Sequence, residues 1–328
     1  MAVVSGSDSA ALRHAAAELA AGGLVAFPTE TVYGLGARAD DDAAVAKIFA
    51  AKGRPADHPL IVHVGDSAGA RAFAREWPAS AQKLAEAFWP GPLTVIVPRR
   101  AGMGTASAAG QDSIGLRCPG HPVARALLEA AAALGVAGVA GPSANRFGRI
   151  SPTTAAHVRE EFGDALTIVD GGECEAGIES AIVDCSRGAP ALLRPGVLTR
   201  AQIEAVLGTR LRAPGDDAPR ASGTLEAHYA PRAKLRLMPP DQLRAALRVL
   251  AKSSVNPVAV YCRTVVPGHS VRASRTMPDN PVAAAHELFA ALRELDASGA
   301  SLIWVETPPD APAWEGVRDR LRRAAAAA

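Results

Sequence analysis

Short apolar segments alternate with segments of helical periodicity along almost the whole chain. Leu60–Val64 and Leu93–Val97 have the length and composition of buried strands, and the segment 80–88 between them carries apolar residues at helical spacing. Such alternation favours an α/β fold, in which helices cover a central sheet. The short apolar segments clustered within 166–194 predict a mixed rather than a wholly parallel sheet.

The periodicity yields a set of expected elements. Helices are expected at 8–21, 40–51, 80–88, 121–134, 153–162, 199–207, 241–252, 281–295 and 314–325. Strands are expected at 24–27, 60–64, 93–97, 113–117, 136–140, 166–170, 180–184, 191–194, 234–238, 258–262 and 301–306. Residues 29–36 are polar and punctuated by glycine, which predicts a turn.

A break in this rhythm divides the chain. The 328 residues suffice for about two domains. Residues 210–232 lose all periodicity and contain several prolines and glycines, as a linker would. We therefore predict a first α/β domain at 1–208, a linker at 209–232, and a smaller, mostly parallel α/β domain at 233–328.

Composition and charge exclude several classes of protein. Hydrophobic residues make up 48% and charged residues 21%, which rules out a disordered chain. Aromatic residues are only 4%, too few to favour a single-stranded nucleic-acid reader. The first 208 residues carry 18 basic and 21 acidic side chains (net −3), and the rest carry 17 and 12 (net +5). General nucleic-acid affinity is therefore expected in the C-terminal part.

The four cysteines and the N-terminus indicate the compartment. The cysteines are widely spaced without a CxxC pair, which favours buried free thiols over a zinc cluster or disulfide framework. Residues 1–20 lack the features of a signal peptide, and no apolar run has the length of a membrane helix. We expect a cytoplasmic protein with no membrane partner.

Two polar segments follow predicted strands. Phe27–Gly36 and Gly141–Asn145 combine hydroxyl groups with glycine at a strand end, the usual ligand position in an open α/β sheet. A hydrogen-bonded turn explains either segment equally well. No GxSxG motif is present, so Ser143 is not expected to be a hydrolase nucleophile.

Lys52 and Arg54 lie at the predicted end of the helix 40–51. Positive charge is favoured there by the helix dipole, so an electrostatic cap explains both residues. The alternative is a phosphate clamp, because nucleotidyl transfer needs fixed cations around the attacked phosphorus. The sequence has no Walker-type or GxGxxG loop for that task.

His58 and His63 are five residues apart on an extended segment, which turns them to opposite faces and disfavours a two-histidine metal site. No metal ligand from protein side chains is predicted. Ser180 and Arg194 are polar residues in predicted strands that are otherwise apolar. They could form a buried pair. Alternatively, Ser180 could present its hydroxyl to a small substrate and Arg194 its guanidinium to a phosphate.

Five segments, in this order and spacing, together resemble the Sua5/YrdC/YciO family. They are Pro28–Gly36, Lys52–Pro55, Pro142–Asn145, Gly177–Ser180 and Arg194–Gly196. His228–Pro231 in the linker further resembles the two-domain Sua5 branch, so the resemblance covers nearly the whole chain.

The resemblance implies a fold and a reaction. The fold would be a YrdC-like open twisted mixed sheet with helices, followed by a smaller Rossmann-like α/β domain. The activity would be a nucleotidyltransferase that condenses L-threonine, bicarbonate or CO2, and ATP with Mg2+ to L-threonylcarbamoyladenylate and pyrophosphate. This product feeds the t6A modification of tRNA position 37, so transient contact with the t6A transferase complex or with tRNA is a further expectation.

The resemblance also implies roles for individual residues. Four residues would form the central polar group of the site: Lys52, Arg54, Ser143 and Asn145. ATP would be contacted by Arg54, His58, Ser113, Ser143, Ser151, Arg194 and Tyr229, the last reaching back from the linker as part of a lid. Threonine would be held by Thr31, His63, Arg117 and Ser180, with the guanidinium of Arg117 on the α-carboxylate.

Two other functions remain as alternatives. One is a double-stranded RNA or tRNA-binding module, against which the net charge of −3 in residues 1–208 counts. The other is a YciO-like paralogue without robust synthase activity, against which the second domain and the four central polar residues count.

Overall fold

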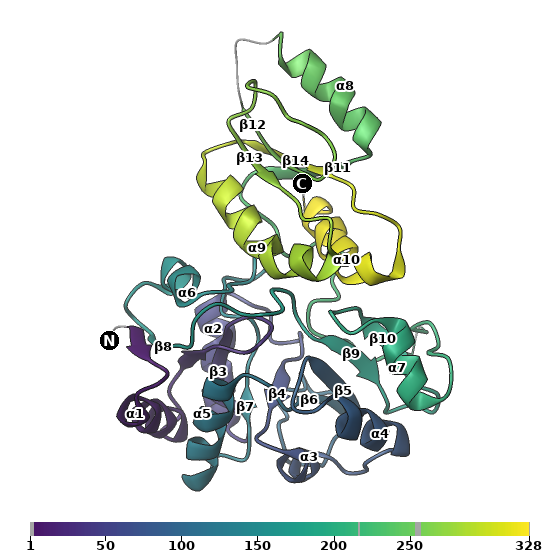
Figure 1. Cartoon of the computed structure of the whole chain (residues 1–328). Coiled ribbons are helices and arrows are strands. Elements are labelled where there is room, and N and C mark those ends of the chain that lie inside the picture. Colours follow the sequence, from purple (N-terminus) through teal and green to yellow (C-terminus); the bar gives the residue numbers. More distant parts are fainter. Residues whose placement is uncertain (1–2, 216, 253–256, 328) are drawn as a thin grey trace. The chain divides into compact units, whose positions relative to one another are not determined.

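The structure is a computed structural model that describes residues 3–215, 217–252 and 257–327. Its backbone contacts divide the chain into two compact units, both drawn in Figure 1. The first unit comprises Met1–Phe147 and Ser151–Thr224, and the second comprises Gly148–Ile150 and Leu225–Ala328.

The first unit is built on one mixed sheet, as predicted. Its strands in the described residues are β1 (Val3–Ser5), β2 (Val25–Phe27), β3 (Gly34–Arg38), β4 (Ile61–His63), β5 (Leu93–Pro98), β6 (Ser113–Arg117), β7 (Val139–Ala140), β8 (Thr167–Asp170), β9 (Ala181–Asp184) and β10 (Ala191–Arg194). Their order is β1-β8-β2-β3-β7-β4-β6-β5-β9-β10. Parallel pairs such as β4 with β6 occur beside antiparallel pairs such as β5 with β6.

Helices pack on both faces of this sheet. They are α1 (Ser9–Ala20), α2 (Asp42–Lys52), α3 (Ser67–Phe73), α4 (Ala79–Phe88), α5 (Pro122–Ala133), α6 (Ala155–Phe162) and α7 (Arg200–Leu207). Val25 and Phe27 of β2 join the apolar cluster of α1 and α5, whereas Ala26 between them joins the cluster that contains Ile48 of α2. Successive side chains of a strand point to opposite faces, so both faces of the sheet are covered.

The end of α2 is fixed by its own sequence. Asp41 caps the helix by accepting from the amides of Ala43 and Ala44, and Gly53 ends it in the left-handed conformation with φ +62°. Lys52 is therefore the last helical residue, one position beyond the helix predicted at 40–51.

The second unit holds a smaller parallel sheet. Its strands are β11 (Lys234–Met238), β12 (Val258–Cys262), β13 (Ala273–Thr276) and β14 (Leu302–Glu306), in the order β11-β14-β12-β13. All of these strand pairs are parallel. The other elements are α8 (Pro240–Leu250), α9 (Pro281–Ala297), the short 3-10 helix η1 (Pro312–Trp314) and α10 (Glu315–Ala325). Helix α8 covers one face of the sheet, and α9 and α10 lie on the other (Figure 1).

Besides η1, four elements in the described residues were not predicted from the sequence. Strands β1 and β13 lie at sheet edges, where few apolar side chains are needed, and α3 spans only seven residues. Strand β3 occupies part of the segment expected to be a turn. A Cβ at Gly36 would lie 2.9 Å from Phe27 Cε1, so glycine is needed there for the ring to pack, and it hides the strand pattern.

The described part of the chain adds three observations. All four cysteines are buried with free thiols. No helix within it is both long and apolar enough to cross a bilayer. No cluster of three or more His, Cys, Asp or Glu side chains within it could hold a metal ion.

Candidate active site

The loop that follows β2 is organised by its own hydroxyl groups. Thr29 Oγ1 accepts from the amides of Thr31 and Val32, both at 3.2 Å, and donates to the carbonyl of Val32 at 2.7 Å. The hydroxyl of Thr31 lies 2.8 Å from that of Thr29. Both threonines are buried, so the loop holds Thr31 in one orientation.

The structure brings the predicted residues Thr31 and Arg117 into contact. Arg117 ends β6, and its Nη1 donates to Thr31 Oγ1 at 2.8 Å. Its Nη2 forms an ion pair with Glu30 Oε1 at 2.7 Å, and both side chains are almost fully buried. Glu30 was not predicted as a site residue, although it lies inside the polar segment Phe27–Gly36.

His63 lies beside Arg117, because β4 and β6 pair in parallel with these two residues in register. Its ring is buried and meets the ring of Phe27 edge-on, with centroids 5.7 Å apart. Burial, followed by the charge of Arg117, lowers the pKa of His63 to about 3. His63 is therefore a neutral imidazole at physiological pH.

Lys52 holds the loop at 142–145. Its Nζ donates to the carbonyl oxygen of Ser143 at 2.6 Å and to that of Asn145. Burial, followed by the charge of Arg54, lowers the pKa of Lys52 well below its usual value. Because these contacts are with backbone carbonyls, Lys52 positions the Ser143 and Asn145 side chains, and an electrostatic cap of α2 is not its whole role.

Arg54 completes this central group on the first unit. Its Nη2 donates to the carbonyl of Pro59 at 3.0 Å, and its guanidinium lies 5.6 Å from the ring centroid of Phe147. His58 packs against the same ring at 5.4 Å, and burial followed by the Arg54 charge lowers its pKa. Phe147, which the sequence analysis missed, is thus a common platform for Arg54 and His58.

Ser180 and Arg194 also meet. Arg194 Nε donates to the carbonyl of Ser180 at 3.0 Å and its Nη2 to the hydroxyl of Ser180 at 3.2 Å. Thr94 of β5 contacts the same hydroxyl at 2.8 Å. Thr94 was not predicted, since nothing in a buried apolar strand marks one threonine as the partner of a serine 86 positions away.

Residues 220–222 of the predicted linker lie on the first unit. The amide of Arg220 donates to Gln111 Oε1 at 2.8 Å, and Arg194 Nη1 donates to the carbonyl of Ser222 at 2.9 Å. The methyl group of Ala221 packs with Ile61, Ile96 and Ile182. These residues line a small recess together with Ser113, whose buried hydroxyl has no hydrogen-bond partner among the described residues.

Ser151 and Tyr229 lie in different surroundings. Ser151 is buried and donates to Glu179 Oε1 at 2.5 Å, and Glu179 belongs to the segment Gly177–Ser180. Tyr229 belongs to the second unit, where its ring is stacked on His228 at 4.2 Å and lies 5.4 Å from Phe289. Its contact with ATP stays a prediction.

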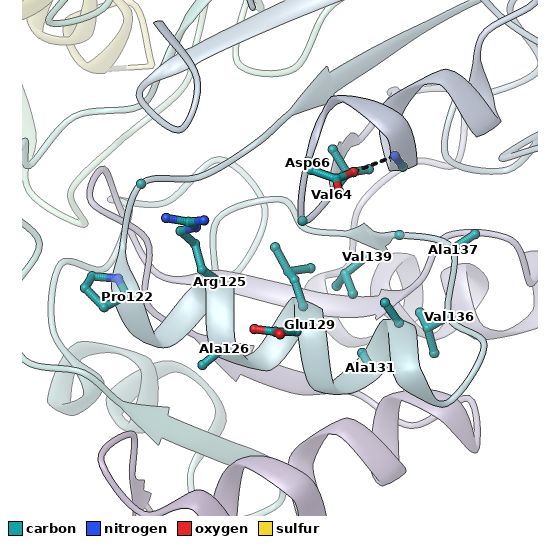
Figure 2. Close-up of a pocket in the computed structure, with 16 residues that line it drawn as sticks. Val64, Asp66, Pro122, Arg125, Ala126, Glu129, Ala131, Val136, Ala137 and Val139 are labelled. Atoms are coloured by element: carbon teal, nitrogen blue, oxygen red, sulfur yellow. Dashed lines mark hydrogen bonds between the residues drawn. The ribbon is translucent and has the colours of Figure 1, made fainter.

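A separate hollow of about 650 Å³ lies between α5 and the ends of β4 and β7 (Figure 2). Val64, Val136 and Val139 give it an apolar wall, and Arg125 and Glu129 project beside it from α5. None of the residues predicted to bind ATP or threonine lines it, so this hollow is distinct from the site assembled above.

The site as a whole suits anionic ligands. Three buried guanidinium groups, those of Arg54, Arg117 and Arg194, belong to it, with Lys52 beneath the loop at 142–145. Buried polar atoms without a hydrogen-bond partner in the described ranges include His63 Nδ1, Ser113 Oγ and Arg117 Nη2, the last of which is ion-paired with Glu30. Such atoms are uncommon in a folded protein and are expected where a ligand or water completes the site.

Comparison with known proteins gives matches over nearly the whole chain. A family model described as "Telomere recombination" and covering Sua5, YciO and YrdC matches residues 17–196. A second, described as "Threonylcarbamoyl-AMP synthase, C-terminal domain", matches residues 198–326.

Individual relatives also match over nearly the whole chain. The threonylcarbamoyl-AMP synthase of Pyrococcus abyssi is 39% identical over 324 residues, which cover 95% of this chain and 93% of that protein. The synthase of Bacillus subtilis is 37% identical over 330 residues, or 96% and 92% of the two chains. The crystal structure of P. abyssi Sua5 complexed with L-threonine superposes with a TM-score of 0.88 at 36% identity, covering 98% of this chain and 95% of that one. The chain therefore belongs to the Sua5/YrdC/YciO family and has the two-domain architecture of its Sua5 members.

Proposed function

We propose that this protein is an L-threonylcarbamoyladenylate synthase. It condenses L-threonine, bicarbonate or CO2, and ATP to threonylcarbamoyl-AMP and pyrophosphate. Threonylcarbamoyl-AMP is the precursor of the t6A modification at tRNA position 37. The observation that carries the proposal is 39% identity over 95% of the chain to a threonylcarbamoyl-AMP synthase. The buried cations and the unpartnered polar atoms of the first unit agree with it.

The threonine end of the site is formed by Thr31, His63, Arg117 and Ser180. A guanidinium binds a carboxylate through two parallel hydrogen bonds, which suits Arg117 to the α-carboxylate of threonine. Neutral His63 can accept or donate a hydrogen bond without adding a charge. The solved complex of P. abyssi Sua5 with L-threonine supports this class of ligand.

The nucleotide end is formed by the cations and hydroxyls around the loop at 142–145. Arg54 and Ser143 would contact the phosphates, and His58, Ser113, Ser151 and Arg194 would contact other parts of ATP. Tyr229 would add a contact from the linker. Lys52 acts through the loop that it holds, since its Nζ is directed at the carbonyls of Ser143 and Asn145.

The reaction itself needs positioning and charge stabilisation. The threonine amine adds to CO2 and releases one proton, which forms a carbamate. A carbamate oxygen attacks the α-phosphorus, the bond to the β-phosphate oxygen breaks, and pyrophosphate leaves with the electron pair. Fixed guanidinium groups stabilise the charge that develops on the phosphates. No covalent enzyme nucleophile is required.

Mg2+ would enter with ATP. In ATP-using enzymes this ion is usually held by phosphate oxygens of the nucleotide and by water. Its chemistry would be to neutralise the departing pyrophosphate.

The product is a mixed anhydride that hydrolyses readily, so water must be kept away from it. Residues 220–222 pack on the sheet beside Ser113 and Arg194, which supports a lid role for the linker 209–232. Transient transfer to the t6A transferase complex or to tRNA is part of the same proposal.

The test is pyrophosphate release by the purified protein with ATP, Mg2+ and bicarbonate. We expect release to depend on threonine. Equal pyrophosphate release with and without threonine would refute the proposal and favour one of the two alternatives, the YciO-like paralogue or the RNA-binding module. A gel-shift assay with tRNA would then distinguish between these two alternatives.

A further inference from the structure

Glu30 makes contacts that go beyond a structural ion pair. Its Oε1 lies 2.7 Å from Nη2 of Arg117, and its Oε2 accepts from the amide of Gly120 at 3.0 Å. Only 13% of the Glu30 side chain and 4% of the Arg117 side chain is exposed. Both oxygens of the carboxylate are therefore engaged within the protein, and Glu30 does not itself face a substrate.

Arg117 is fixed from three directions. Besides Glu30, its Nη1 donates to the hydroxyl of Thr31 at 2.8 Å and its Nε to the carbonyl of Gly91 at 3.3 Å. A guanidinium carries five N–H groups. Two of them, on Nη1 and Nε, donate to Thr31 and Gly91, whereas Nη2 is held by the ion pair with Glu30 without a hydrogen bond. Three N–H groups therefore make no hydrogen bond within the described part of the protein.

The hydroxyl groups of the loop support the same arrangement. Thr29 donates to the carbonyl of Val32, so the hydrogen bond between the two threonines is donated by Thr31. The Thr31 hydroxyl is then left to accept from Arg117. Glu30, Thr31 and Arg117 form one connected network, in which Glu30 supplies the only negative charge.

We propose that Glu30 is a positioning residue for the amino-acid substrate, which it serves by orienting and neutralising Arg117. This inference rests on the proposed function, because it assigns N–H groups of Arg117 that make no hydrogen bond in the described residues to the substrate carboxylate. A buried arginine without a counter-ion is costly and turns toward other partners. Affinity for a carboxylate depends on the guanidinium being held in place before the ligand arrives.

The network also predicts which substitutions fail. Glu30 Oε1 is ion-paired with Arg117, and Oε2 accepts a hydrogen bond from the amide of Gly120. A glutamine side chain has one acceptor oxygen and one donor NH2 group. In Glu30→Gln the NH2 group would therefore face another donor, either the guanidinium of Arg117 or the amide of Gly120. Glu30→Asp keeps the charge and both acceptors on a shorter stem, and is expected to restore part of what glutamine loses.

The experiment measures threonine binding and turnover in the same full-length proteins. Isothermal titration with L-threonine gives the Kd without ATP, and threonine-dependent pyrophosphate release gives KM and kcat. Glu30→Gln is expected to raise the Kd and KM for threonine by about tenfold or more, with the KM for ATP within about twofold. Glu30→Asp is expected to fall between wild type and Glu30→Gln.

The matched control is Glu204→Gln. Glu204 also accepts a hydrogen bond from a backbone amide, that of Leu211 at 2.9 Å, but it lies on α7 outside the site. Thermal melting checks that each variant is folded. A purely structural role for Glu30 would lower Tm and leave the Kd for threonine unchanged.

The outcomes separate this inference from the proposed function. An unchanged or lower Kd for threonine in folded Glu30→Gln overturns the positioning role, whatever the turnover. Wild-type protein that binds threonine without releasing pyrophosphate refutes the synthase while the Kd values still decide the role of Glu30. Wild-type protein that does not bind threonine refutes both.

Discussion

At the scale of single residues, the site depends on side chains that act through backbone atoms. Lys52 contacts two carbonyl oxygens of the loop at 142–145, Arg194 contacts the carbonyls of Ser180 and Ser222, and Arg54 contacts that of Pro59. Sequence motifs identify such residues but do not show that they bind backbone carbonyls. Every residue has a carbonyl, so the sequence does not show which carbonyl is the partner.

Lys52→Met should therefore damage both stability and activity. The substitution keeps the apolar stem but leaves the carbonyls of Ser143 and Asn145 buried without their donor, at a cost of about 2–4 kcal/mol. Urea unfolding and pyrophosphate release measure the two effects. Lys47→Met on the same helix removes the exposed Nζ that contacts the carbonyl of Gly22 at 2.6 Å, and equal losses from both variants would contradict the role of Lys52.

Arg54→Ala should instead lower turnover by orders of magnitude while the fold survives. The reason is the loss of a fixed cation that would stabilise charge developing on the phosphates. The control is Arg71→Ala, which removes a guanidinium stacked 5.2 Å from the ring of Trp77 at the surface. Turnover of Arg54→Ala within a fewfold of that control would remove Arg54 from the mechanism.

His63 should make stability depend on pH. The pKa of its buried ring is lowered to about 3, whereas the unfolded chain protonates near its ordinary value of about 6.5. Between these values the unfolded state binds more protons, so the free energy of unfolding rises with pH from about 3 to about 6.5. His63→Gln should flatten this slope in urea titrations, and an unchanged slope would show that His63 is not buried as neutral imidazole.

At the scale of elements, glycine decides where one strand of the sheet can form. Strand β3 pairs with both β2 and β7, yet its segment reads as a turn because Gly34 and Gly36 give it no apolar alternation. Phe27 and Val139 lie so close to Gly36 that no larger side chain fits at this position. The requirement for glycine can be recognised only when the neighbouring strands are known.

Gly36→Ala should destabilise the first unit by about 1–3 kcal/mol. Its Cβ would lie 2.9 Å from Val139 Cγ1 and 3.1 Å from the carbonyl oxygen of Val25, so the strands must separate. Gly115→Ala on β6 is the control, because its Cβ meets its nearest atom at 3.4 Å. Equal melting temperatures for the two variants would contradict the packing argument.

At the scale of the whole molecule, the sequence predicted the α/β class, the mixed first sheet and the parallel second sheet. These features follow from local periodicity and from the order of elements. The sequence could not identify Glu30, Thr94, Phe147 or Glu179 as partners of the predicted residues. Their contacts join positions far apart in the chain, such as Glu30 with Arg117 and Ser151 with Glu179, and only the folded sheet brings these positions together.

The proposed function requires that one site join threonine, CO2 and the adenylate of ATP. The most direct test is mass spectrometry of a reaction that contains the purified protein, 13C-bicarbonate, L-threonine, ATP and Mg2+. We expect a threonylcarbamoyl adenylate that carries the 13C label and appears only when threonine is present. Formation of ADP or unlabelled AMP alone would contradict it, because the nucleotide would then be used without capture of the carbamate.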